Sequence, residues 1–333
     1  MTVIYREDAA DPAALDGCQI AVIGYGNLGR PMALNLRDSG LNIIVGNVDD
    51  PYRDQAIQDG FETMGLSEAA AIADVKLMLL PDEAMPDLYL KHISPSLRPG
   101  HTLVFASGYN VTFGFIEPPP FVDVLLLAPR TMGTGVREGY VAGQGFLSFI
   151  AVGQDATGNA WPHLMALALV AGSLRAGAFE LTFRQEAELD LFIQQALLPA
   201  LHTLMFTAAD LLVKEGYPPE AALLDLYISG ELSYSLRKAA ELGIMDTLKL
   251  YSLTGQYGIL SRSERFQEPK LRHLMEISLD EIRSGKFAQE WTAEYANGYP
   301  RLDALRTKRG NMALWALEQQ VMELLRQSPP PAL

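Results

Sequence analysis

The sequence is poor in cysteine, in long apolar runs and in positive charge. Its one cysteine, Cys18, cannot form an internal disulfide. No uninterrupted apolar run reaches the length of about 18 residues that a membrane-spanning helix needs. The first residues contain acids and no apolar segment, so we expect no secretory signal. These absences predict a cytoplasmic protein with no membrane partner.

The charge balance is acidic. Lys and Arg number 26 against 40 Asp and Glu, and the net charge is −14. Such a chain repels the phosphate backbone of nucleic acids, so we expect no nucleic-acid partner. The length of 333 residues, 49% of them hydrophobic, suits two domains that each bury a core.

The first half of the chain alternates short apolar, β-rich runs with helical stretches. This alternation is typical of an α/β fold, and it predicts a doubly wound parallel sheet, as in a Rossmann domain. The β-rich runs are Gln19–Ile23, Leu41–Val45, Val75–Leu80, Thr102–Phe105, Val122–Leu127 and Phe146–Val152.

The pattern changes near Thr182, where long helical stretches begin. We therefore predict an N-terminal α/β domain over residues 1–181, an all-α domain over 182–327 and a disordered tail over 328–333. The helices predicted in the second domain are Glu186–Lys214, Pro219–Leu242, Leu271–Ser284 and Met312–Arg326.

A glycine-rich loop follows the first β-rich run and precedes a helix. Its pattern is G-x-G-x-x-G, in which the first glycine makes a tight turn and the second lets a pyrophosphate approach the backbone. The third glycine lets the helix pack against the strand. We predict a nicotinamide dinucleotide here; the alternative is a purely structural turn. The loop residues are Gly24, Tyr25, Gly26, Asn27, Leu28 and Gly29.

An acid follows the second β-rich run. Asp49 lies about 20 residues beyond the glycine loop, where a carboxylate accepts hydrogen bonds from a ribose diol and repels a 2′-phosphate. Together with the nearby Asn47, it is predicted to bind the cofactor, and NAD(H) is favoured over NADP(H). The alternative is that Asp49 caps the helix that begins at Pro51.

At this point the chain resembles the class I ketol-acid reductoisomerases along nearly its whole length. The resemblance implies a Rossmann domain followed by a knotted helical domain, and a homodimer whose subunits share their active sites. The family reaction is a Mg²⁺-assisted alkyl shift followed by hydride reduction to a 2,3-dihydroxy acid. The matching stretches include AVIGYGNLGRPMALNLRDSG from Ala21, LLPDE from Leu79, LRPGHTLVFASGYNV from Leu97, APRTMG from Ala128, RAGAFELTFRQEAELDLFIQQALL from Arg175 and LYSLTGQYG from Leu250.

The resemblance also implies further cofactor-binding positions. The loop after the third β-rich run passes near the cofactor, although an ordinary strand-end turn is the alternative for it. These positions are Leu80, Pro81, Asp82, Ser107 and Gly133.

The family holds two Mg²⁺ with two pairs of carboxylates spaced i, i+4, which places each pair on one helix face. Here the first pair reads Asp190 and Gln194, and the second reads Tyr227 and Glu231. Half of the hard anionic ligands are therefore missing, and we expect at most one weakly bound Mg²⁺. Asp190 and Glu231 remain candidates for metal binding or acid–base catalysis; the alternative is a solvated helix face.

Other site positions differ from the family as well. Ser107 replaces a histidine, Arg130 a lysine and Thr134 a histidine, whereas Ser252 matches the family's substrate-binding serine. Arg130 stays charged, so it is predicted to pair with a substrate carboxylate; a surface or interface ion pair is the alternative. Thr134, Gln194, Tyr227 and Ser252 are predicted to contact substrate, with core packing as the alternative for Tyr227. Ser107, Arg130 and Ser252 join the two acids as catalytic candidates.

These changes predict an NAD(H)-dependent enzyme of specialised metabolism that acts on a small 2,3-dihydroxy or 2-keto-3-hydroxy acid. One form of this hypothesis is oxidation at C2, ring closure from C3 to a cyclopropanol with loss of a sulfonium leaving group, and hydride return. The resemblance suggests it, because related enzymes make such rings. The alternatives are a genuine ketol-acid reductoisomerase and a non-catalytic NAD-binding protein.

Overall fold

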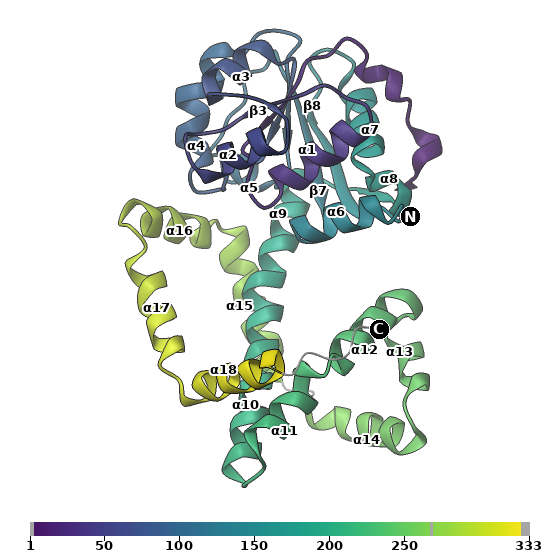
Figure 1. The fold of residues 1–333 in the computed structure, drawn as a ribbon, viewed down its shortest axis with the longest axis vertical. Coiled ribbons are helices and arrows are strands. Elements are labelled where there is room, and N and C mark those ends of the chain that lie inside the picture. The colour runs from purple at the N-terminus through teal and green to yellow at the C-terminus, as the bar shows by residue number, and fades with distance from the viewer. Residues whose placement is uncertain (1–2, 267–268, 328–333) are drawn as a thin grey trace. The chain divides into compact units, whose positions relative to one another are not determined.

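The computed structural model describes residues 3–266 and 269–327. It divides into two compact units, Met1–Asp190 and Leu191–Leu333. The division falls within one helix, further along the chain than the predicted domain boundary near Thr182. The predicted tail, 328–333, lies outside the described residues. Figure 1 shows the course of the chain through both units.

The first unit is built on a sheet whose described part has nine strands in the order β1-β9-β8-β7-β6-β5-β2-β3-β4. The six strands from β4 to β7 run parallel, and the order reverses between β2 and β5, as in a Rossmann sheet. The strands are β1 (Ile4–Tyr5), β2 (Ile20–Ile23), β3 (Ile43–Gly46), β4 (Glu62–Met64), β5 (Val75–Met78), β6 (Thr102–Phe105), β7 (Asp123–Pro129), β8 (Ser148–Gln154) and β9 (Ala178–Glu180).

The six predicted runs all form strands, but the sheet is mixed and not wholly parallel. Strand β8 runs antiparallel to β7, and β1 runs antiparallel to β9. The prediction of a purely parallel sheet was wrong at this edge, because the connection over residues 130–147, which contains α6, returns the chain beside β7 in the opposite direction. Strands β1, β4 and β9 were not predicted.

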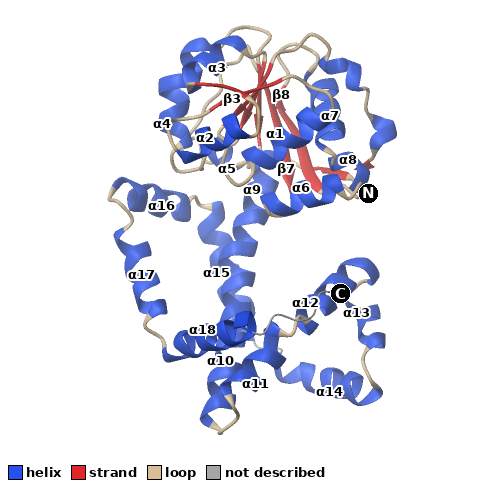
Figure 2. Ribbon diagram, in the orientation of Figure 1, coloured by secondary structure: helices blue, strands red, loops and turns tan. Residues whose placement is uncertain are grey.

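Helices cover both faces of this sheet (Figures 1 and 2). One face packs on α1, α6 and α7, and the other on α3, α4 and α9. Strand β2 is buried throughout: Ile20 and Val22 face one layer, and Ala21 and Ile23 face the other. The helices are η1 (Glu7–Ala9), η2 (Pro12–Leu15), α1 (Gly29–Asp38), α2 (Pro51–Gln58), α3 (Leu66–Ile72), α4 (Met85–Leu88), η3 (Tyr89–Ile93), η4 (Ser94–Ser96), α5 (Tyr109–Thr112), α6 (Gly133–Val141), α7 (Ala160–Ala171), α8 (Ser173–Ala176) and α9 (Phe183–Phe192).

The described part of the second unit is entirely helical, as predicted (Figure 2). A π-helical turn, η5 (Ile193–Leu197), carries α9 into α10 (Leu198–Lys214). The remaining helices are α11 (Pro219–Leu223), η6 (Leu224–Ile228), α12 (Glu231–Leu242), α13 (Ile244–Thr247), η7 (Leu248–Leu250), α14 (Leu253–Ser263), η8 (Glu264–Phe266), α15 (Pro269–Arg283), α16 (Lys286–Ala296), α17 (Pro300–Gly310) and α18 (Ala313–Gln327).

The helix predicted over Pro219–Leu242 is interrupted. Segment η6 is a second π-helical turn, and Gly230 then adopts a positive φ of 83° before α12 begins. A positive φ ends a right-handed helix, so the prediction of one continuous helix was wrong here. Whether the chain is knotted, as the resemblance implies, stays a prediction.

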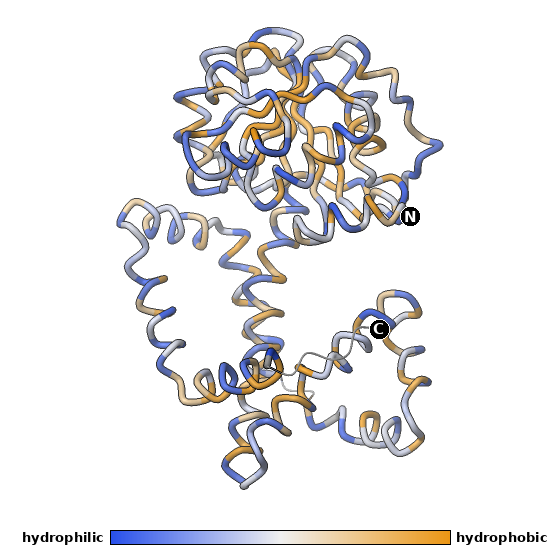
Figure 3. The backbone as a smooth tube through the Cα atoms, in the orientation of Figure 1, coloured by the Kyte–Doolittle hydropathy of each residue, from blue (hydrophilic) through white to orange (hydrophobic). Residues whose placement is uncertain are grey.

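The two units differ in how they bury apolar side chains. Figure 3 shows hydrophobic segments gathered on the strands of the first unit, whereas short hydrophobic and polar segments alternate along the helices of the second. Among the described residues, the 32-residue helix Phe183–Lys214 has the length and hydropathy of a membrane span, with 11% of its most apolar window buried. An interface helix of a water-soluble assembly has the same properties.

Candidate active site

The candidate site lies at one edge of the sheet of the first unit. Strands β2, β3, β5, β6 and β7 are parallel, so their carboxyl ends share that edge. The glycine loop follows β2, Asp49 follows β3, Asp82 follows β5, Ser107 follows β6 and Arg130 follows β7. Ligands of open α/β sheets bind at this edge, beside the point where the strand order reverses.

The geometry of the glycine loop fits a dinucleotide. Gly24 has a φ of +100°, and a Cβ there would meet the carbonyl oxygen of Leu79 at 2.6 Å. A Cβ at Gly29 would meet the carbonyl oxygen of Gly24 at 1.9 Å. A Cβ at Gly26 would meet no protein atom within 4 Å, so this glycine leaves open space. Helix α1 starts without a side-chain cap, which suits an anion at its N-terminus.

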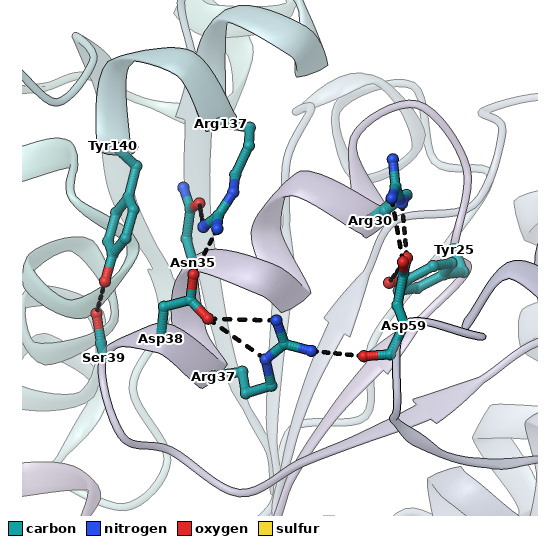
Figure 4. A network of polar contacts seen from close by, with 9 residues as sticks. All are labelled: Tyr25, Arg30, Asn35, Arg37, Asp38, Ser39, Asp59, Arg137 and Tyr140. Carbon is teal, nitrogen blue, oxygen red and sulfur yellow. Dashed lines mark hydrogen bonds and ion pairs between the residues drawn. The ribbon is translucent and has the colours of Figure 1, made fainter. Parts of the chain in front are cut away.

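Polar contacts hold this loop in place (Figure 4). The Tyr25 hydroxyl donates to Asp59 at 2.8 Å, and Arg30 donates to the same carboxylate through Nε and Nη2 at 2.6 and 3.1 Å. The Tyr25 amide donates to Oδ1 of Asn47 at 2.9 Å. Because the Tyr25 side chain is fully buried, the loop offers a cofactor only the backbone of this residue. Asn47 is 5% exposed, so it supports the loop through this buried hydrogen bond.

The same network ties α1 to α6. Arg137 donates to Oδ1 of Asn35 at 2.9 Å and to Oδ2 of Asp38 at 2.5 Å, and Ser39 and Tyr140 share a hydrogen bond of 2.7 Å (Figure 4). At the start of α6, a Cβ on Gly133 would lie 1.7 Å from the carbonyl oxygen of Asn27. The predicted cofactor residue Gly133 is therefore required by the close packing of two loops.

The structure decides which of the neighbouring acids Asp49 and Asp50 caps helix α2. Asp50, not Asp49, caps α2, because its Oδ1 accepts hydrogen bonds from the amides of Tyr52 and Arg53 at 2.9 and 3.2 Å. The capping alternative for Asp49 was therefore wrong. Asp49 is exposed at the end of β3.

Asp82 lies in the loop after β5 with Leu80 and Pro81. Asn110 donates through Nδ2 to the Asp82 carbonyl oxygen at 3.0 Å. Burial raises the pKa of Asp82 to about 6, and the nearby Glu83 and Asp190 carboxylates add to this. The carboxyl group of Asp82 therefore exchanges its proton near neutral pH.

Ser107 and Gly108 follow β6. The Ser107 hydroxyl accepts a hydrogen bond from the Tyr109 amide at 3.2 Å. The Gly108 amide donates to Oε2 of Glu186 at 2.6 Å, and a Cβ on Gly108 would lie 2.2 Å from the Phe183 carbonyl oxygen. Glycine at position 108 thus lets α9 approach the sheet edge closely.

Arg130 forms ion pairs with two acids on successive turns of α9. Its Nη1 donates to Oε1 of Glu186 at 3.1 Å, and its Nη2 donates to Oδ1 of Asp190 at 3.0 Å. The guanidinium also lies over the ring of Phe149, 4.9 Å from the ring centre. The sequence assigned Arg130 to a substrate carboxylate, with a surface or interface ion pair as the alternative. The structure shows an ion pair within one unit, as in the surface form of the alternative, and the substrate contact stays a prediction.

Sequence reasoning missed Glu186, which is 1% exposed. Burial raises the pKa of Glu186 to about 7; the Gly108 amide and Arg130 oppose this rise, and Asp190 and Asp82 add to it. One signal was available, since Glu186 and Asp190 are spaced i, i+4 and so lie on one helix face. Of the two acids with a raised pKa, Asp82 was therefore among the predicted residues and Glu186 was not.

The donors do not fit a pair of Mg²⁺ ions. Gln194 is exposed on the π-helical turn η5, and Asp190 is engaged by Arg130. Within residues 3–266 and 269–327, no group of three or more His, Cys, Asp or Glu side chains is arranged to hold a metal ion. Hard dications need several anionic oxygens, and this set supplies too few.

The remaining predicted residues of the second unit lie on separate elements. Tyr227 is in η6, and Glu231 is the first residue of α12, beyond the turn at Gly230. The prediction that these two share one helix face was therefore wrong. The Tyr227 hydroxyl donates to Glu318 on α18, and burial with this carboxylate raises the pKa of Tyr227. Ser252 is exposed, and its Oγ accepts from the Gly255 amide at 3.1 Å at the start of α14.

Tyr227 also lines a cavity of about 400 Å³ within the second unit. Aromatic side chains and two opposite charges surround it, and Arg309 lies 4.1 Å from the ring centre of Phe206. Tyr227 packs against an apolar cluster, which supports the core-packing alternative, and its contact with substrate stays a prediction. Thr134 is exposed in the first turn of α6.

A Rossmann-type sheet with an open glycine loop, followed by a helical unit, defines an NAD(P)-dependent oxidoreductase. Two family models cover the chain: "Acetohydroxy acid isomeroreductase, NADPH-binding domain" over residues 14–177 and "Ketol-acid reductoisomerase, C-terminal domain" over residues 183–327. The chain belongs to the ketol-acid reductoisomerase family, as the sequence resemblance predicted.

Individual relatives agree with this assignment. The chain is 41% identical over 316 residues to "Putative ketol-acid reductoisomerase 3" of Saccharolobus solfataricus, covering 94% of this chain and 95% of that protein. It is 38% identical to "Ketol-acid reductoisomerase (NADP(+))" of Pyrobaculum calidifontis, covering 98% and 99%. The structure of an NADH-preferring ketol-acid reductoisomerase from an uncultured archaeon matches with a TM-score of 0.92 and 34% identity, covering 97% and 99%.

Proposed function

We propose that this protein is an NAD(H)-dependent oxidoreductase that acts on a small 2,3-dihydroxy or 2-keto-3-hydroxy acid, remodelled from the family reaction. One contrast carries the proposal. The glycine loop keeps the geometry of a dinucleotide site, whereas two of the four positions that hold carboxylates in the family are Gln194 and Tyr227. The Tyr227 hydroxyl is hydrogen-bonded to Glu318.

The two halves of the family reaction make different demands. Moving an alkyl group between adjacent carbons requires two dications that hold neighbouring oxygens and take up charge. Hydride transfer requires a positioned nicotinamide and a polarised carbonyl or alcohol. The donors present fit the second requirement and not the first, so we propose that the redox half is retained and the alkyl shift is impaired.

A bound nicotinamide dinucleotide would supply the chemistry of hydride transfer at C2 of the substrate. The chain supplies the rest. The backbone of residues 24–29 holds the pyrophosphate at the start of α1. Asp82 and Glu186, whose pKa values are raised to about 6 and 7, exchange protons near neutral pH. Arg130 keeps a fixed positive charge beside them.

We propose NAD(H) as the preferred cofactor. Asp49 is exposed where the ribose of a dinucleotide lies in this fold, and its carboxylate repels a 2′-phosphate. Asp50, which is engaged as the cap of α2, adds a second negative charge nearby. Seven of the curated relatives are named for NADP(+), whereas one solved structure is described as NADH-preferring, so the proposal depends on Asp49 and not on the names of the relatives.

One specific reaction accommodates a redox site without a metal pair. Oxidation of the C2 alcohol of a 5-sulfonio-2,3-dihydroxypentanoate removes a hydride from C2 and a proton from its hydroxyl. The new ketone acidifies C3–H; loss of that proton lets C3 bond to C5 as the C5–S bond breaks and a neutral sulfide leaves. Hydride and proton return to C2. The net products are a cyclopropanol, a sulfide and one proton.

The test incubates the protein with this sulfonium diol and NAD⁺ and follows the products by mass spectrometry. We expect a cyclopropanol product and release of sulfide with a catalytic amount of NAD⁺. Absence of both ring product and cofactor reduction contradicts the specific reaction. A parallel assay with 2-acetolactate, NADH and Mg²⁺ tests the broader proposal, which expects negligible turnover.

The family match over nearly the whole chain favours a second candidate, a genuine ketol-acid reductoisomerase with unusual ligands. Turnover of 2-acetolactate at the ordinary rate of such enzymes supports that candidate. Tight NADH binding with no hydride transfer to any 2-keto-3-hydroxy acid instead indicates a non-catalytic dinucleotide-binding protein.

We further propose a cytoplasmic homodimer that shares its active sites, with domains at 1–181 and 182–327 and no nucleic-acid partner. Leu204 and Leu211 on α10 are more than half exposed within one chain, which supports burial against a second copy. Under this proposal Glu231, Tyr227 and Ser252 complete a site only after two chains meet.

A further inference from the structure

Arg130 holds an unusual position at the sheet edge. Its two terminal nitrogens are divided between two carboxylates on α9, at 3.1 Å from Glu186 and 3.0 Å from Asp190. Its side chain is 24% exposed, and its planar group lies over the Phe149 ring. A guanidinium is permanently charged, and its rigid fork can pair with two separate acids.

Glu186 shows that this contact is built into the fold. Its Oε1 accepts from Arg130 and its Oε2 accepts from the Gly108 amide at 2.6 Å, so both oxygens are fixed. Gly108 is itself required, because a Cβ there would collide with the Phe183 carbonyl oxygen. The end of β6, the end of β7 and the start of α9 therefore converge to present two acids to one guanidinium.

We propose that Arg130 is a built-in cation that takes the place of a divalent ion at Asp190 and makes this part of the site independent of magnesium. The inference deepens the proposed function, on which it rests, by naming what balances the acid charge there. Under this proposal Arg130, which replaces a lysine of the family, balances the charge of Asp190 and does not bind the substrate carboxylate.

Charge repulsion prevents the Arg130 guanidinium and a divalent ion from binding the Asp190 carboxylate at the same time. This repulsion disfavours a dication at the Asp190 carboxylate, because Oδ1 of Asp190 already lies 3.0 Å from the permanently charged guanidinium of Arg130. An ammonium group is a point charge on a flexible stem and can withdraw, whereas the guanidinium is held by Glu186, Asp190 and Phe149.

The test measures divalent-ion binding to the full-length protein, without substrate. Free Mn²⁺ is followed by electron paramagnetic resonance, and Mg²⁺ by the shift in Tm at matched ionic strength. The variants are Arg130→Gln, Arg130→Gln with Asp190→Asn, and Arg137→Gln as the matched control. Arg137 and Asp38 are 28% and 34% exposed, close to the 24% and 35% of Arg130 and Asp190. NADH binding reports that each variant is folded.

We expect no Mn²⁺ binding by the wild type or by Arg137→Gln in the low-millimolar range. Arg130→Gln should bind Mn²⁺ at least about tenfold more tightly than the wild type, and the added Asp190→Asn change should abolish the gain. Two results overturn the proposal: wild-type binding that Arg130→Gln does not improve, or an Arg130→Gln variant that binds NADH but no Mn²⁺. Because no substrate is used, a wrong substrate assignment leaves this result unaffected.

Discussion

The two units of this chain solve the problem of apolar burial differently. In the first, the sheet is covered on both faces, and residues such as Ile20 and Leu125 are at most 1% exposed. In the described part of the second, one buried cluster contains Ala209, Leu223, Leu314 and Val321. The first unit completes its core within one chain, and the second leaves surfaces that suit a second copy.

The comparison extends to chemistry. The first unit carries the glycine loop, Arg130 and the acids on α9, all fixed by contacts within that unit. In the second unit, Tyr227 lies in η6, Glu231 begins α12, and Ser252 immediately precedes α14. The predicted cofactor site therefore lies in the first unit. The two positions at which a family carboxylate is replaced, Gln194 and Tyr227, lie in the second unit, which leaves apolar surface exposed.

The largest expected effect tests the exposed surface of the second unit. Replacing Leu204 and Leu211 by glutamate should convert the proposed homodimer to a monomer, because two buried charges cannot be accommodated at an apolar interface. Light scattering after size exclusion measures the mass. The matched control replaces Ile57 and Ile72 of the first unit, which are 55% and 46% exposed against 56% and 58% for the leucines. Equal masses for both double variants would refute the interface.

The next effect concerns the glycine loop. Gly29→Ala places a Cβ 1.9 Å from the Gly24 carbonyl oxygen, so we expect a loss of about 3 kcal/mol in the free energy of unfolding. Gly26→Ala meets no protein atom within 4 Å and should leave stability unchanged within about 0.5 kcal/mol, yet weaken NADH binding more than about tenfold. Denaturant titration and NADH fluorescence measure these. Unchanged NADH affinity in Gly26→Ala would contradict the pyrophosphate assignment.

A buried charge in the first unit gives a pH-dependent prediction. Lys76 on β5 is fully buried, and burial lowers its pKa to about 8. Between pH 8 and 10.5 the unfolded chain retains the Lys76 proton that the folded protein has released, so the free energy of unfolding rises with pH. Lys76→Met should therefore stabilise the protein at pH 7 by about 2 kcal/mol.

Denaturant titrations of the wild type and Lys76→Met between about pH 7 and pH 9.5 check this, because tyrosines begin to titrate in the unfolded chain at about pH 10. The difference between the two proteins should shrink as the pH rises. A difference that stays constant or grows would contradict the assignment of the cost to the lysine charge.

The smallest effect concerns cofactor choice. Asp49→Ser removes a carboxylate that repels a 2′-phosphate, so the ratio of NADH to NADPH affinity should fall about tenfold, or about 1.4 kcal/mol. Asp54→Ser, which removes an exposed acid from α2, is the control and should leave the ratio unchanged. A ratio that does not move in Asp49→Ser would show that another residue sets the preference.

The sequence predicted most of the first unit because its signals are local. Apolar runs marked the six long strands, and glycine spacing marked the cofactor loop. The antiparallel β8 was missed as such, because its apolar composition is the same for either direction. In the second unit, the break before Glu231 was missed although Gly230 signalled it.

The site was harder to predict because its contacts join distant segments. Glu186 was within reach of the sequence argument through its spacing from Asp190, but its partners were not. Arg130 follows β7 and Glu186 lies on α9, and their ion pair depends on how closely α9 approaches the sheet at Gly108. No local pattern encodes that approach, so the replacement at position 130 was read as a substrate contact.

The most direct test of the retained redox half compares two substrates by NADH absorbance. One is 2-acetolactate with Mg²⁺, which requires the alkyl shift; the other is the already rearranged 3-hydroxy-2-keto acid with a chelator. We predict NADH oxidation with the rearranged acid in the chelator and negligible oxidation with 2-acetolactate. Brisk oxidation with 2-acetolactate that the chelator abolishes, together with no reaction of the rearranged acid in the chelator, would contradict the account.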